Sequence, residues 1–176
     1  MSNPLNALLP RADSLSSPYV STPDSCRFGF ETREQQQLSQ DPLVIQRLLR
    51  KARTIAVVGL STDTQRASWI VANYLQQAGY RIIPVNPKAT EILGQKVYPD
   101  LASIPEPVDL VNVFRRPAEC LAAAEQAVAI HAPALWLQLG VINLDAAERA
   151  RLAGLTVVMD RCIEIEHARY FGATAP

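Results

Sequence analysis

Short, mainly apolar runs alternate along this chain with segments of helical periodicity. The apolar runs span residues 54–58, 82–85, 108–114, 134–140 and 155–159. An unbroken apolar run of this length is typical of a strand buried on both faces of a parallel sheet. Strands that alternate with helices form βαβ units with right-handed crossovers. We therefore predict an α/β fold: a doubly wound, mostly parallel five-stranded sheet with helices on both faces.

The segments between these runs predict the helices. Asp41 and Pro42 have the residue types of an N-cap and a first helical position. Apolar residues then recur at helical spacing, and later helices are expected to begin at Pro117, at Asn143 and near Cys162. The apolar positions of these helices are Ile45, Leu48, Leu49 and Ala52, then Val71, Tyr74, Leu75 and Ala78, then Leu121, Ala124 and Val128.

Three smaller features carry their own predictions. Pro84 lacks a backbone N–H, so we expect irregular pairing of the strand at 82–85. Residues 90–100 are predicted to form a polar loop with one weak strand at 96–98. Residues 101–104 are expected to form one helical turn that ends before Pro105.

Residues 1–40 differ in composition from the rest of the chain. They are rich in Ser, Pro, Thr and Gln and have few clustered aliphatic residues. Such a segment buries too little apolar surface to offset its ordering entropy. We predict a flexible or surface-packed extension at 1–40 and a single domain at 41–176.

Composition and charge exclude several classes of protein. The 176 residues are 48% hydrophobic with a formal net charge of +0, and no dense basic run suggests a nucleic-acid surface. No apolar stretch approaches the roughly 20 residues that span a bilayer, and the first residues do not resemble a secretory signal. The three cysteines lack paired spacing, which argues against a disulfide framework or a metal site. We expect a cytoplasmic protein.

The candidate site follows from the predicted sheet. In an open doubly wound sheet, ligands bind outside the carboxyl ends of the strands. Those ends are rich in cations and amides and poor in acids, which suits a ligand with several phosphates. The residues are Gly59, Leu60, Ser61 and Arg66, then Asn86, Pro87 and Lys88, then Phe114, Arg115 and Arg116, then Gln138, Leu139 and Gly140, and finally Met159, Asp160, Arg161 and Cys162.

Two details weigh against NAD as that ligand. The Gly-x-Gly-x-x-Gly fingerprint is absent, because Ser61 stands at its second glycine. The second strand ends in Asn86 and Lys88 instead of the acidic residue that binds the adenine ribose. A cation there suits a ribose phosphate, which NADP and coenzyme A (CoA) both carry. The residues alone leave these two ligands open.

Five motifs in order resemble the stand-alone CoA-binding domain family, over about residues 41–170. They are AVVGLS (56–61), IPVNP (83–87), VNVFRRP (111–117), LWLQLGV (135–141) and VVMDRCI (157–163). The family's Rossmann-like fold is similar to the N-terminal domain of the succinyl-CoA synthetase α subunit. The prolines usual after the first strand are replaced by Thr62, Thr64 and Ala67. The phospho-histidine motif of the synthetases is absent, so we expect no ligase chemistry from this polypeptide alone.

The resemblance implies a role for each matching residue. Backbone N–H groups of Gly59, Leu60 and Ser61 would hold the CoA diphosphate, together with Arg66. Lys88 would meet the ribose 3′-phosphate, beside Asn86 and Pro87 at the adenine. The path of the adenosine and pantetheine would be lined by Val113, Phe114 and Arg115.

Several residues have two interpretations. Gln138 either binds the ligand or fixes a loop, and Arg161 either approaches the phosphates or pairs with Asp160 or a helix end. Cys162 is either a reactive thiol near the thiol of CoA, able to form a mixed disulfide with it, or a small buried residue. Trp136 is predicted to pack in the core. The acidic segment Glu164, Glu166 and His167 is predicted to form a mostly exposed helix face.

The sequence therefore predicts a protein that binds CoA or an acyl-CoA without evident catalysis of its own. An NAD(P)-binding or redox-sensing Rossmann protein is the enzyme-class alternative. A third alternative is a domain whose crevice has degenerated and which serves only in protein contacts. A protein partner and a homo-oligomer stay open.

Overall fold

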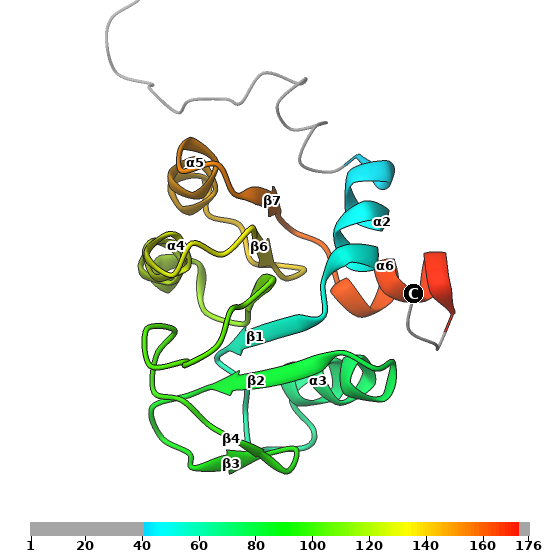
Figure 1. Cartoon of the computed structure of the whole chain (residues 1–176), viewed down its shortest axis with the longest axis vertical. Coiled ribbons are helices and arrows are strands. Elements are labelled where there is room, and N and C mark those ends of the chain that lie inside the picture. Colours follow the sequence, from blue (N-terminus) through cyan, green and yellow to red (C-terminus); the bar gives the residue numbers. More distant parts are fainter. Residues whose placement is uncertain (1–40, 173–176) are drawn as a thin grey trace, which may run out of the picture. The chain divides into compact units, whose positions relative to one another are not determined.

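Five parallel strands form the centre of the molecule (Figure 1). The computed structural model describes residues 41–172. The sheet has the order β2-β1-β5-β6-β7, so the strand order reverses between β1 and β5. This confirms the predicted doubly wound, Rossmann-like α/β fold. The strands are β1 (Thr54–Val58), β2 (Arg81–Val85), β5 (Leu110–Val113), β6 (Ala134–Leu137) and β7 (Thr156–Val158).

Helices cover both faces of this sheet (Figure 1). On one face, α4 (Cys120–Ala129) and α5 (Leu144–Leu152) pack on alternate strand residues such as Ala56 and Val58. On the other face, α2 (Pro42–Lys51), α3 (Ala67–Gln77) and α6 (Ile163–Phe171) pack on Ile55 and Val57. Because every strand contributes to both cores, the strands are mainly apolar, and Asn112 of β5 is a fully buried polar exception.

The predicted caps are present at two helices. Asp41 Oδ1 accepts a hydrogen bond from Leu43 N at 2.8 Å at the start of α2. Asn143 Oδ1 accepts one from Ala146 N at 2.7 Å at the start of α5. Each carboxylate or amide oxygen satisfies an N–H that has no acceptor within its helix.

The prediction of irregular pairing at Pro84 is wrong. Strand β2 pairs with β1 in a continuous parallel register in which Pro84 lies opposite Val57. The Pro84 carbonyl points away from β1 and accepts a hydrogen bond from Tyr98 N at 3.0 Å. The N–H that proline lacks would lie on that same outer side, so the bonds to β1 are unaffected.

The segment between β2 and β5 also differs from the prediction. A short hairpin, β3 (Glu91–Ile92) and β4 (Gln95–Lys96), replaces the weak strand at 96–98, and Tyr98 forms a separate parallel bridge with Val85. Residues 101–104 form a turn closed by Ile104 N and Leu101 O, with no helix. After β5, the 3₁₀ turn η1 (Pro117–Glu119) leads directly into helix α4.

Two predicted helix faces are corrected as well. In α4 the buried side chains are Cys120, Ala123, Ala124 and Ala127, whereas Leu121 is exposed. In α6, Glu166 and His167 are buried rather than exposed. Ion pairs of Glu166 with Arg161 at 3.1 Å and with Arg169 at 3.0 Å compensate its burial.

The predictions for residues 1–40 and 173–176 lie outside the described residues. Within residues 41–172, every helix is too short or too polar to cross a membrane.

Candidate functional site

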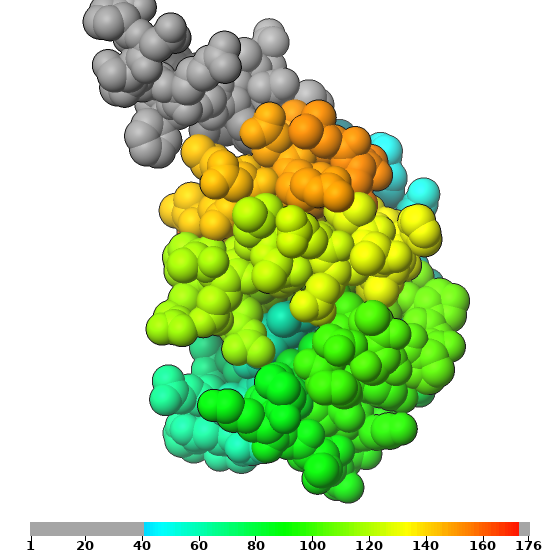
Figure 2. All heavy atoms as spheres, turned by 90° about the vertical axis from the view of Figure 1, so that its left-hand side faces the viewer, coloured from blue at the N-terminus to red at the C-terminus, as the bar shows by residue number. Residues whose placement is uncertain are grey.

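A pocket of about 950 Å³ opens at the carboxyl ends of the strands. Figure 2 faces this edge and shows a hollow between the yellow-green α4 region and the green segment after β2. All five strand ends contribute to the pocket, as the sequence predicted. Its lining residues are Gly59, Ser61, Arg66, Ala67, Ser68, Val71, Asn86, Pro87, Lys88, Phe114, Arg115, Arg116, Gln138, Leu139, Val141, Cys162 and Ile165.

The charged residues of this lining all have the same sign. Arg66, Lys88, Arg115 and Arg116 line the pocket, and the described lining residues include no carboxylate. Glu119, outside the lining, pairs with Arg116 and lies 3.7 Å from Arg115 Nη1. Hydrogen bonding to Arg116 lowers the pKa of Glu119, which keeps it ionised. Asp63, also outside the lining, lies 3.6 Å from Arg66 Nε. Four cations against two nearby carboxylates still leave an excess of positive charge, which favours a polyanionic ligand.

Gly59 lies where the ends of β1 and β5 approach each other. Its φ is +85°, and a Cβ at this position would clash with the Phe114 carbonyl oxygen. Its backbone N–H donates to Val85 O at 2.9 Å and extends the pairing of β1 with β2. A side chain at residue 59 would therefore separate the two strand ends that form the pocket floor.

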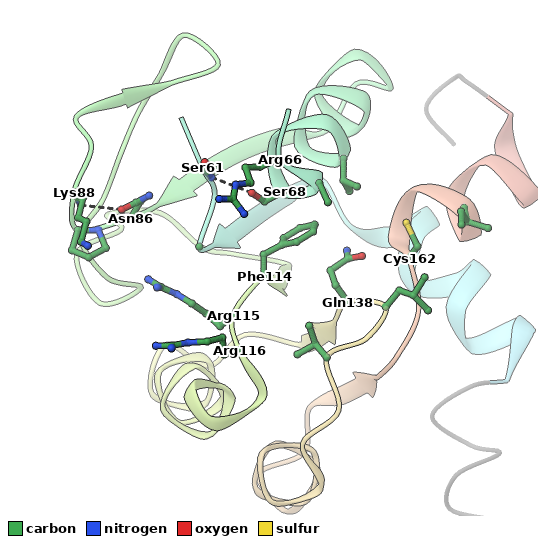
Figure 3. A pocket seen from close by; sticks show the side chains of 17 residues that line it. Ser61, Arg66, Ser68, Asn86, Lys88, Phe114, Arg115, Arg116, Gln138 and Cys162 are labelled. Carbon is green, nitrogen blue, oxygen red and sulfur yellow. Dashed lines mark hydrogen bonds between the residues drawn. The ribbon is translucent and has the colours of Figure 1, made fainter. Parts of the chain in front are cut away.

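The loop from β1 to α3 is fixed by its own side chains (Figure 3). The backbone N–H of Ser61, predicted to face a diphosphate, donates to Ser68 Oγ at 3.1 Å. Ser61 Oγ in turn accepts from Asp63 N at 3.0 Å. Because Ser68 Oγ accepts from Ser61, its own proton is available to an acceptor in the pocket. Ser68 is thus a lining donor that the sequence prediction did not include.

Asn86 ties the ends of β1 and β2 together. Its Nδ2 donates to Leu60 O at 2.8 Å, and its Oδ1 accepts from Lys88 N at 2.9 Å. This arrangement fixes the backbone from which the Lys88 side chain extends into solvent. Within the described chain, the Lys88 ammonium pairs with no carboxylate.

Three of the residues with a suggested binding role do not line the pocket. Leu60 and Val113 are fully buried in the two cores, and Arg161 pairs with Glu166. Val113 does not line the pocket because successive side chains of a strand point to opposite faces: Val113 faces α4, whereas its neighbour Phe114 faces the pocket. The ten other residues with a suggested binding role all line the pocket, as does Arg116.

The end of the pocket opposite Lys88 is less charged (Figure 3). Gln138 and Cys162 lie there, and the lining also includes their sequence neighbours Leu139, Val141 and Ile165. Cys162 is the N-cap residue of α6 and is half-buried, and its reactivity stays a prediction. Leu139 is a predicted strand-end residue without a binding role, and Ile165 is not predicted, because exposed aliphatic side chains (64% and 55%) have no distinctive chemistry in the sequence. Among residues 41–172, no group of three or more His, Cys, Asp or Glu side chains could hold a metal ion.

Comparison with known proteins identifies the family. The family model described as a CoA binding domain matches residues 53–168. The chain belongs to the CoA-binding domain family. The matched region contains every strand of the sheet and every residue of the pocket lining.

Relatives of this family span several organisms. The uncharacterized protein YneT of Bacillus subtilis is 44% identical over 124 residues, which cover 70% of this chain and 92% of YneT. The structure of a hypothetical protein from Pyrococcus horikoshii is 37% identical, with a TM-score of 0.73, and covers 74% of this chain and 92% of that one. An ADP-forming acetate–CoA ligase of Archaeoglobus fulgidus is 37% identical over 63 residues, which cover 35% of this chain but 9% of the ligase. The family is thus related to regions of CoA ligases.

Proposed function

We propose that the pocket binds CoA or an acyl-CoA and that this chain has no catalytic activity of its own. The observation that carries the proposal is the lining itself, in which four cations and no carboxylate occur among the described residues. CoA presents a diphosphate and a 3′-phosphate, and both are matched by guanidinium and ammonium groups. Membership of the CoA-binding domain family supports the same ligand.

The proposed ligand extends along the strand ends. Its diphosphate lies near Arg66 and Ser68, where the first N–H groups of α3 have no acceptor within the helix. Its 3′-phosphate lies near Lys88, and its adenine near Pro87. Its pantetheine arm passes Phe114 toward Gln138 and Cys162, so the thiol lies at the less charged end.

A thermal-shift panel tests the proposal against the nicotinamide alternatives. A ligand at about 100 times its dissociation constant adds about 2.7 kcal/mol to the free energy of unfolding. We expect stabilisation by CoA or acetyl-CoA and little by NAD, NADP or ATP. Stabilisation by a nicotinamide coenzyme but not by CoA would overturn the proposal, and no stabilisation by any of them would favour a role in protein contacts.

The role proposed for Lys88 has its own test. Lys88→Ala should weaken CoA binding about tenfold while leaving dephospho-CoA nearly unchanged, since only CoA carries the 3′-phosphate. Calorimetric titration measures both affinities. Lys51→Ala is the matched control, because Lys51 is exposed on α2 and lies outside the pocket lining. Equal losses for CoA and dephospho-CoA would refute the assignment of the 3′-phosphate.

A further inference from the structure

Two buried amide side chains meet below the less charged end of the pocket. Asn112 in β5 is 0% exposed, and Gln138 just after β6 is 3% exposed. Gln138 Nε2 donates to Asn112 Oδ1 at 2.8 Å. Gln138 lines the pocket, whereas Asn112 does not.

The sheet register explains why these amides meet. Asn112 lies opposite Val57 and Trp136, between two apolar strands, and Gln138 follows Trp136 by two residues on the same face. Val111 and Val113, on either side of Asn112, face the opposite core. Leucine or valine would suit the position of Asn112, so packing alone does not explain an amide there.

The pairing leaves one buried group unsatisfied. Within the described residues, Asn112 Nδ2 has no hydrogen-bond partner. A buried donor without an acceptor destabilises the fold, and such groups in native proteins call for an explanation. We attribute the presence of this unsatisfied N–H group to the role of Asn112 in orienting the Gln138 amide.

The hydrogen bond from Gln138 Nε2 to Asn112 fixes the orientation of the Gln138 amide. Its nitrogen is engaged by Asn112, which leaves its Oε1 as a hydrogen-bond acceptor of a residue that lines the pocket. A carbonyl oxygen attracts N–H donors and disfavours phosphate. The pocket lining also includes Leu139, Val141 and Ile165, close in sequence to Gln138 or Cys162, and these side chains suit an apolar chain.

We propose that the Asn112–Gln138 pair recognises an amide N–H in the arm of the ligand and so makes the pocket selective for pantetheine. This rests on the proposed function, since pantetheine is a flexible arm with two amide groups. Gln138 makes the contact, and Asn112 is a positioning residue that acts through Gln138. The cations at the other end bind the phosphates and do not distinguish CoA from a nucleotide without the arm.

The test compares CoA with adenosine 3′,5′-bisphosphate, which keeps the 3′-phosphate but lacks pantetheine. Gln138→Leu should lower the affinity for CoA about fivefold to tenfold, because one buried hydrogen bond is lost. The same substitution should change the affinity for the bisphosphate less than about twofold. Asn112→Leu should give the same pattern, because it frees the Gln138 amide to rotate. Lys88→Ala is the contrasting variant and should weaken both ligands by the same factor.

The outcomes separate this inference from the proposed function. If the wild-type protein binds neither ligand, the proposed function itself fails. If it binds CoA but Gln138→Leu loses affinity for both ligands equally, or for neither, selection of the arm by Gln138 is refuted. Thermal melts of each variant establish folding, and Gln138→Met takes the place of Gln138→Leu if the latter does not fold.

Discussion

At the scale of single residues, Gly59 shows how a local signal combines with a distant contact. The sequence predicts a tight turn at the end of β1, and the positive φ of Gly59 agrees with it. The sequence does not reveal that the Phe114 carbonyl lies against Gly59, because that contact joins residues 55 positions apart across two strands. Trp136 was predictable, because a tryptophan inside an apolar strand packs in the core, where its Nε1 donates to Arg161 O at 2.7 Å.

Replacing Gly59 tests the effect of that contact. Gly59→Ala should lower the free energy of unfolding by about 3 kcal/mol or more, from strained backbone plus the clash with Phe114. Gly154→Ala is the matched control, because Gly154 has a φ of +89° and open space where a Cβ would lie. Gly154→Ala should lower the free energy of unfolding by about 1 kcal/mol. Chemical denaturation measures both, and equal losses would contradict the role of the Phe114 contact.

At the scale of elements, the segments after β6 and β7 are locked together. Gly140 N donates to Asp160 Oδ1 at 2.8 Å, and Asp160 adopts a φ of +57°. Arg161 then pairs with Glu166 of α6, which fixes the turn that carries Cys162. The sequence predicts each element but not this network, because ion pairs across a turn leave no period in the pattern of apolar residues.

Helix α6 also carries a buried histidine that the sequence placed on the surface. His167 is 0% exposed and packs against the rings of Tyr74, Tyr80 and Phe171. Tyr74 Oη donates to Gly172 O at 2.8 Å, so the 3.0 Å contact with His167 Nδ1 requires Nδ1 to donate to Tyr74. Burial lowers the pKa of His167 from its usual 6.5.

This burial predicts a dependence of stability on pH. Below pH 6.5 the unfolded chain binds a proton on His167 before the folded chain does, so the free energy of unfolding falls as the pH falls. His167→Phe should flatten this decline between about pH 7.5 and about pH 5.5, as measured by denaturation at each pH.

The control for that experiment is the other histidine of the chain. His131 is exposed and has a φ of +55°, which asparagine tolerates, so His131→Asn should leave the pH dependence unchanged. An unchanged slope in His167→Phe would contradict the account of a buried neutral histidine.

At the scale of the whole molecule, the order of apolar runs was enough to predict the sheet and the edge at which the pocket lies. Ten of the thirteen residues for which the sequence suggested a binding role line the pocket, because parallel strands bring all their carboxyl ends to one edge. Ile165 could not be predicted, since only the packing of α6 brings it to the pocket.

Calorimetric titration with CoA tests whether this cationic pocket binds the coenzyme. The wild-type chain should bind CoA at one site, and Arg115→Ala should weaken that binding at least about tenfold because one of the four cations of the pocket lining is lost. Arg47→Ala removes an equal charge from the exposed face of α2, outside the pocket lining, and should bind CoA as the wild type does. No heat of binding in the wild-type protein, or equal affinity in the Arg115 and Arg47 variants, would contradict the account.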